Sequence, residues 1–247
     1  MANFNQEAEQ KEFISKVLVT KTELPANDER NKSGVDKTLV GFGRVDEYTN
    51  DKGELEKPNA RAVMAKVANV NKFLSAVGEN NMPLQISAKD GEKDVYMKAN
   101  CFTDSGISKN GNAYRWYKMA FELQPEIKNE AGEITQQKQT IYATKGNGGY
   151  SFDENNDKAL INKFNALVAN GVSINLAASR NDTLKEHQGL MNALGQFEKS
   201  AVFEVGSMKQ QGAYIKGFTE LDNSGKEKGM QKVLDIATKS QDQSRDM

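Results

Sequence analysis

The strongest constraint on the fold is an alternation of apolar and polar residues over the stretch from Tyr96 to Leu123. Two runs, Val95–Phe102 and Ala113–Leu123, flank a connector that contains Asp, Ser, Asn and Gly residues. Successive side chains on a strand point to opposite faces, and connectors of this composition favour turns. The stretch is therefore predicted to form one long β-hairpin.

The alternation gives the two faces of this hairpin different roles. The face expected to line the core carries Val95, Met97, Ala99, Cys101, Tyr117, Met119, Phe121 and Leu123. The opposite face carries Tyr96, Lys98, Asn100, Phe102, Tyr114, Trp116 and Lys118. Aromatic rings interleaved with lysines on an open sheet face are typical of proteins that stack bases and neutralise phosphates. The alternative is that a helix or a second sheet covers this face.

A candidate nucleic-acid site follows from that second face. Bases are expected to stack on Tyr96, Phe102, Tyr114 and Trp116, with Lys98 and Lys118 at phosphates. Lys109, in the connector, is expected to close over the bound strand. Arg44 is expected on a neighbouring strand.

Two amphipathic helices organise the rest of the chain. Residues 59–77 carry Val63, Val67, Val70, Leu74 and Val77 on one stripe, and Gly78 ends the segment. Residues 153–170 form the second predicted helix, which begins at a capping Asp153 and stops at Gly171.

The order of elements around these helices repeats. We predict an α+β protein with two similar strand-rich units, residues 12–124 and 135–225, as in an internal duplication. Each unit would be OB-like or an open antiparallel sheet. A polar arm, residues 1–11, precedes them, and a C-terminal helix with a polar tail occupies residues 226–247.

The two units differ in the chemistry of their hairpins. The hairpin of the second unit carries Glu198, Ser200 and Glu204 on its outward side, and these carboxylates would repel phosphates. Tyr214, Lys216 and Phe218 are its outward residues that resemble the first hairpin. The N-terminal unit is therefore expected to dominate binding.

Charge and cysteine content narrow the class of function. The chain has 33 Lys and Arg residues against 34 Asp and Glu residues, so any basic surface must be local. Its one cysteine, Cys101, excludes an intramolecular disulfide and fits a reducing compartment. The polar N-terminus predicts no secretory signal, and no run approaches the ~18 apolar residues of a membrane-spanning helix. We expect a cytoplasmic protein, or one that acts in the cytoplasm of a host.

Motifs for catalysis or cofactor binding are missing. The glycine clusters at 41–43 and 146–149 lack the following Gly-Lys-Ser/Thr of a phosphate-binding loop. His187 is the only histidine and Cys101 the only thiol, which excludes a Cys/His zinc site within one chain. The sequence therefore predicts a protein that is not an enzyme and holds no metal or cofactor.

The favoured function is binding of single-stranded nucleic acid, preferably DNA, in replication or recombination. The alternative is a structural or assembly protein of a virion or scaffold, whose exposed rings would make protein–protein contacts instead. In either case the polar C-terminal tail is a candidate docking segment for a partner protein.

Overall fold

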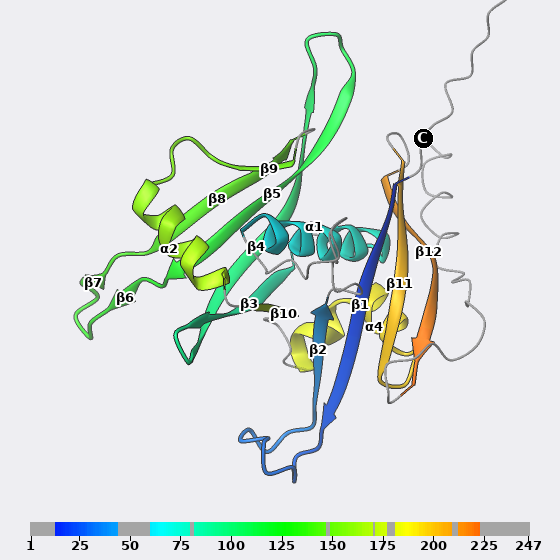
Figure 1. The fold of residues 1–247 in the computed structure, drawn as a ribbon. Helices are drawn as coiled ribbons and strands as arrows, with labels where there is room; N and C mark the ends of the chain where they lie inside the picture. The colour runs from blue at the N-terminus through cyan, green and yellow to red at the C-terminus, as the bar shows by residue number, and fades with distance from the viewer. Residues whose placement is uncertain are drawn as a thin grey trace, which may run out of the picture.

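The computed structural model describes residues 13–43, 60–79, 82–146, 149–169, 171–176, 181–208 and 212–222. Within these ranges the chain forms a large antiparallel sheet curved around a central helix (Figure 1). This is an α+β architecture, as the sequence predicts. The predicted N-terminal arm, the C-terminal helix and tail, and Arg44 lie outside the described residues.

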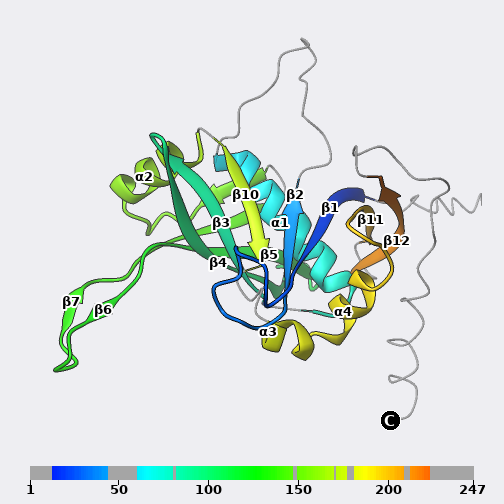
Figure 2. The same cartoon turned by 90° about the horizontal axis from the view of Figure 1, so that it is seen from below.

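Ten strands make up the sheet, in the spatial order β12-β11-β1-β2-β10-β3-β4-β5-β8-β9. Their bounds are β1 (Phe13–Leu24), β2 (Lys37–Gly43), β3 (Pro83–Asp90), β4 (Lys93–Ile107), β5 (Ala113–Gln124), β8 (Gln139–Gly146), β9 (Gly149–Phe152), β10 (Val172–Leu176), β11 (Ser200–Met208) and β12 (Gly212–Leu221). A separate two-stranded arm, β6 (Ile127–Lys128) and β7 (Ile134–Gln136), extends from β5 and β8 (Figure 2). The order is open, with β12 and β9 at its edges.

Helix α1 (Ala60–Ala76) lies on the concave face of the sheet and corresponds to the helix predicted over 59–77. It contacts β1, β11 and β12 toward one edge and β4, β5 and β9 toward the other. Its predicted apolar stripe is buried, and Met64 and Phe73 are buried with it. Because apolar strands surround it, α1 also buries the polar residues Asn71 and Lys72. Lys72 Nζ lies 3.3 Å from Ser15 Oγ, which satisfies one of its donors.

Helix α2 (Lys158–Val168) begins later than the sequence predicts. Asp157, not Asp153, is the N-cap, and its carboxylate accepts a hydrogen bond from the Ala159 backbone N–H at 2.8 Å. The assignment of Asp153 as the cap was wrong because residues 153–156 form a turn held against β8. In that turn Asn156 Nδ2 donates to the Tyr142 carbonyl at 2.6 Å, and the Tyr142 N–H donates back to Asn156 Oδ1 at 2.8 Å.

Two short helices, α3 (Asn181–Glu186) and α4 (Gln188–Leu194), fill the segment between β10 and β11. Glu79, just beyond the end of α1, ties α4 to that helix. One of its carboxylate oxygens lies 2.7 Å from His187 Nδ1, and the other accepts the Gly189 N–H at 3.1 Å. The chain then enters the core at Phe197, whose ring lies 5.8 Å from that of Phe203 in β11.

Strands of the two predicted units are interleaved within the one sheet. Strand β10 of the second unit lies between β2 and β3 of the first, β11 pairs with β1, and β8 pairs with β5. The strands that follow the two predicted helices, β3 and β10, pair with each other at the centre of the sheet. The two stretches of sequence therefore share one sheet, and their internal duplication stays a prediction.

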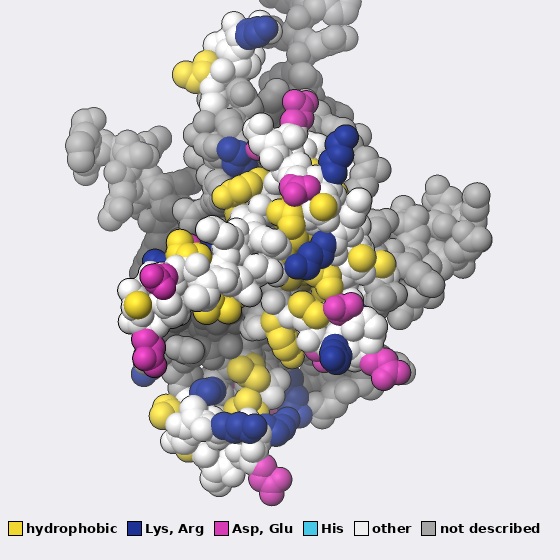
Figure 3. All heavy atoms as spheres, turned by 90° about the vertical axis from the view of Figure 1, so that its left-hand side faces the viewer, with side chains coloured by type: hydrophobic (Ala, Val, Ile, Leu, Met, Phe, Trp, Pro, Cys, Tyr) yellow, Lys and Arg dark blue, Asp and Glu magenta, His cyan; other side chains and the backbone are white. Residues whose placement is uncertain are grey.

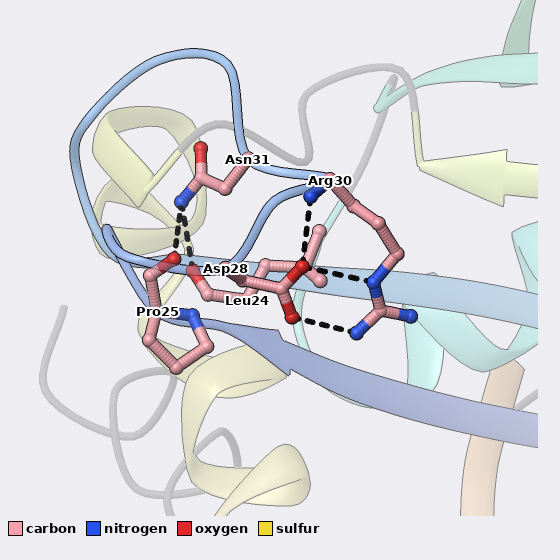
Figure 4. A network of polar contacts seen from close by, with 5 residues as sticks. All are labelled: Leu24, Pro25, Asp28, Arg30 and Asn31. Carbon is pink, nitrogen blue, oxygen red and sulfur yellow. Dashed lines mark hydrogen bonds and ion pairs between the residues drawn. The ribbon is translucent and has the colours of Figure 1, made fainter.

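The loop between β1 and β2 is held by side-chain hydrogen bonds (Figure 4). Buried Asn31 donates from Nδ2 to the carbonyls of Leu24, Pro25 and Val35, at 2.9, 3.0 and 2.7 Å. Asp28 pairs with Arg30 at 2.7 Å. Hydrogen bonds from the Arg30 side chain and backbone lower the pKa of the Asp28 carboxyl to about 2. The loop therefore has a fixed shape although most of its residues are exposed.

Candidate nucleic-acid interface

Strands β4 and β5 form the hairpin on which the candidate site rests. The register pairs Ala99 with Phe121 and Cys101 with Met119. All four of these side chains are buried, as is Met97, while Val95 and Leu123 are partly buried against the core. The Phe121 ring lies 4.8 Å from that of Phe164 in α2, so α2 packs on the concave face beside α1. Burial raises the pKa of the Cys101 thiol far above its usual value.

On the opposite, outer face of the sheet, three of the outward residues predicted on β4 are exposed to solvent. Tyr96 is 61% exposed, and Lys98 and Asn100 are exposed as well. Their exposure means that no described element covers this part of the face. The arrangement suits a surface that accepts a ligand from solution.

The charges on this part of the outer face leave one lysine unengaged. Within the described part of the chain, the side chain of Lys98 makes no hydrogen bond or ion pair. Its cross-strand neighbour Glu122 pairs with Lys138 at 2.9 Å, and Asp94 pairs with Lys89 at 2.7 Å. The Glu122 carboxylate raises the pKa of Lys138. Both carboxylates are thus matched by lysines, which leaves Lys98 available to an anionic ligand.

The remaining predicted residues divide into three groups. Lys118, on β5, is half-buried and pairs in register with Phe102. The register also sets Trp116 opposite Asp104 and Tyr114 opposite Gly106, but the side chains of Phe102, Tyr114 and Trp116 are not among those described. Lys109 is exposed at the projecting turn between β4 and β5 (Figure 1). At ~3.3 Å per residue, roughly 40 Å of strand separates it from Tyr96, so it does not join Tyr96 and Lys98.

The second hairpin departs from the outward set expected for it. Phe218 is buried and stacks on Phe203 with ring centroids 5.2 Å apart, so its assignment to the outer face was wrong. The reason is a register shift between Glu204 and Val205, which interrupts the two-residue period on β12. Alternation alone does not reveal such a bulge.

Three outward residues that sequence reasoning missed extend the outer face on both sides of β4. Tyr142, on β8, is 47% exposed. Gln85 on β3 pairs in register with Lys98, and Asn175 on β10 pairs with Gln85. The sequence signal for Tyr142 was strand alternation, because its neighbours Ile141 and Ala143 are apolar. Both are buried in the structure. For Gln85 and Asn175 the signal lay in the pairing of β3 with β10, which the sequence does not reveal.

Acidic, basic and hydrophobic side chains are interspersed over the side of the molecule that bears α2 and the β6–β7 arm (Figure 3). Across the described ranges, no group of three His, Cys, Asp or Glu residues is arranged to hold a metal ion. No helix in those ranges has the length and apolar character needed to cross a membrane. No family model, curated protein or solved structure matches the chain.

Proposed function

We propose that this protein binds single-stranded nucleic acid, preferably DNA, through the outer face of its sheet and acts in replication or recombination. The observation that carries the proposal is the exposure of Tyr96 beside the unengaged Lys98, on a face that no described element covers. An uncovered sheet face offers room for a strand to lie on.

The binding energy would come from stacking and from phosphate contacts. A base stacked on an aromatic side chain is typically worth ~1–3 kcal/mol, with little preference among bases. Lys98 would contact a phosphate, while Lys138 neutralises Glu122, which would otherwise repel the backbone. Contributions from the other predicted residues stay predictions: Phe102, Tyr114, Trp116, Lys118, Lys109 and Arg44. Quenching of Trp116 fluorescence by an oligonucleotide tests the contribution of Trp116.

The decisive experiment is an anisotropy titration of a labelled oligothymidylate at several salt concentrations. Tyr96→Ala is expected to weaken binding roughly 5- to 150-fold by loss of one stack, and Tyr96→Phe to retain it. Lys98→Ala should lower the slope of log affinity against log salt by about 0.7, the value for one phosphate contact on a single strand. Lys163→Ala, an exposed lysine on α2, is the control and should match the wild-type protein. Absence of binding at low salt, or wild-type affinity in Tyr96→Ala, would overturn the proposal.

A second candidate, the assembly function, is favoured by the β6–β7 arm. Ile127 and Ile134 are 47% and 46% exposed on this arm, which projects away from the sheet (Figure 2). The arm is ordered by hydrogen bonds, including two from side chains to the backbone: Thr135 to the Ile127 carbonyl at 3.2 Å and Gln136 to the Pro125 carbonyl at 2.8 Å. Exposed aliphatic residues on an ordered arm suit a protein contact. Light scattering of the wild type and of Ile127→Ser/Ile134→Ser tests this function, which predicts an oligomer that the double variant converts to monomer.

A further inference from the structure

Beyond the hairpin, the outer face carries a row of polar side chains that crosses the strands at right angles. We infer that Asn175, Gln85 and Lys98, here called the amide row, form a further binding subsite that guides a single strand of nucleic acid across the sheet. This inference rests on the proposed function and specifies the path of the ligand. It extends the interface beyond the hairpin to a strand of the C-terminal half of the chain.

The sheet register aligns the amide row. Asn175 on β10 is directly opposite Gln85 on β3, and Gln85 is directly opposite Lys98 on β4. On the other side of Asn175, Gly41 of β2 is its register partner. Thr20 of β1 is in turn the partner of Gly41. At ~4.8 Å between neighbouring strands, the path from Thr20 to Lys98 is about 19 Å long.

The side chains of the amide row point away from the core and are not used within the fold. Ile174, Ile86 and Met97, which adjoin the row along their strands, are buried on the concave side. Asn175 and Gln85 are half-buried, and their amides make no hydrogen bond with any described residue. Asn is depleted in strands, and no described residue bonds the amide of Asn175 in the middle of this sheet. Both amides can donate to phosphate or base oxygens and accept from base amino groups.

Gly41, which lies between Thr20 and Asn175, adds no side chain to the path. A Cβ atom at this position would lie 2.6 Å from Thr20 Oγ1 and 3.4 Å from Asn175 Oδ1, so both neighbours lean into the space above the glycine. The absence of a side chain on Gly41 therefore leaves only short polar groups on this part of the face. A strand of nucleic acid would meet Thr20 Oγ1 and Asn175 Oδ1 here, and no bulky side chain.

The charge of the amide row favours an anionic occupant. The amide row carries one charge, the unengaged ammonium of Lys98, and the acid next to it, Glu122, is paired with Lys138 at 2.9 Å. Neutral amides and one cation attract phosphates and repel none. Tyr96 is the next residue after the row on the same face of the sheet. Its register partner is Ser87, which is two residues from Gln85 on β3. A strand bound along the row can therefore place a base on Tyr96.

The test uses nearly isosteric changes that add negative charge without altering packing. Gln85→Glu and Asn175→Asp are each expected to weaken binding of a labelled oligothymidylate at low salt by roughly 10-fold or more, through loss of a hydrogen bond and repulsion of phosphate. This weakening should shrink as salt rises. Gln85→Ala and Asn175→Ala should each weaken binding by a smaller factor, roughly 2- to 10-fold. Asn162→Asp, on an exposed position of α2, is the matched control and should change affinity little.

The outcomes separate this inference from the proposed function. Weaker binding by both acidic variants, with unchanged melting temperatures, supports the amide row. Wild-type affinity in both acidic variants, together with weak binding by Tyr96→Ala, overturns the amide row and leaves the proposed function standing. If the wild-type protein binds no oligonucleotide at low salt, both fail.

Discussion

Two buried asparagines of this protein differ in their hydrogen bonding, and replacing them should have opposite effects on stability. Asn71, in the middle of α1, is 1% exposed, and among the described residues neither its side-chain nitrogen nor its oxygen has a hydrogen-bond partner. Asn31, in the β1–β2 loop, is 6% exposed and donates to three carbonyls while its oxygen accepts from Ser33. We expect Asn71→Leu to stabilise the fold and Asn31→Leu to destabilise it.

The magnitudes follow from hydrogen bonding. A buried polar group without a partner costs about 1–3 kcal/mol, and an apolar side chain of similar shape removes that cost. Asn71→Leu also replaces a poor helix former with a good one, worth about 0.5 kcal/mol. Since Leu is larger than Asn, some overpacking offsets the gain, and we expect a net stabilisation of about 1–2 kcal/mol. For a chain of 247 residues, this raises the melting temperature by roughly 2–8 °C.

Urea denaturation followed by circular dichroism measures both variants. Asn31→Leu should lose about 1–3 kcal/mol, because three loop carbonyls lose their donor. Asn71→Ala serves as a second variant at α1, because it removes the amide without adding volume. If Asn71→Leu and Asn71→Ala both destabilise the protein while Asn31→Leu does not, the burial and bonding of these two side chains are not as described.

Three further predictions concern packing and reactivity. Phe121→Ala should destabilise the fold by about 3–5 kcal/mol, while Tyr96→Ala should change its free energy of unfolding by less than about 0.5 kcal/mol; the reverse result in denaturant titrations would contradict the assignment of the two faces. Gly189→Ala should cost at least about 1–3 kcal/mol, because a Cβ atom there would overlap the Val77 carbonyl oxygen, and an unchanged melting temperature would show that α1 and α4 do not meet in this way. The Cys101 thiol, whose pKa is raised by burial, should resist alkylation at about pH 8.5 until urea unfolds the chain, so rapid labelling of the native protein would refute its burial.

The β4–β5 hairpin and α1 were predictable because each follows from a pattern of apolar residues within a short stretch of sequence. The alternation between Val95 and Leu123 gave the β4–β5 hairpin and placed Met97, Phe121 and Cys101 in the core. The spacing of Val63, Val67 and Val70 gave α1 and its buried stripe. In both cases the period of the apolar residues matches the period of the element.

What the sequence did not reveal depends on contacts between distant residues. The insertion of β10 between β2 and β3 joins residues far apart in the chain, and no local pattern encodes it. The amide row depends on that pairing, so Gln85 and Asn175 were not recognised. The bulge on β12 reversed the expected face of Phe218, since one extra residue shifts the alternation beyond it. The β6–β7 arm has only two and three strand residues on its sides, too few for a periodic signal.

Nucleic-acid binding through the outer face and assembly through the β6–β7 arm use different surfaces, so one molecule can have both. Tyr96 and the amide row lie on the outer face of the sheet, whereas Ile127 and Ile134 lie on the arm beyond the ends of β5 and β8.

If the arm joins copies of this chain, neighbouring copies on one long oligonucleotide should bind with an avidity that a short one does not allow. Ile127→Ser/Ile134→Ser should then weaken binding to a long oligothymidylate by roughly 100-fold or more, the low end of the gains typical of linked sites, and leave binding to a short one unchanged. Equal weakening on both lengths would show that the arm touches nucleic acid directly. No effect on either length, in a protein that light scattering finds monomeric, would remove the arm from both functions.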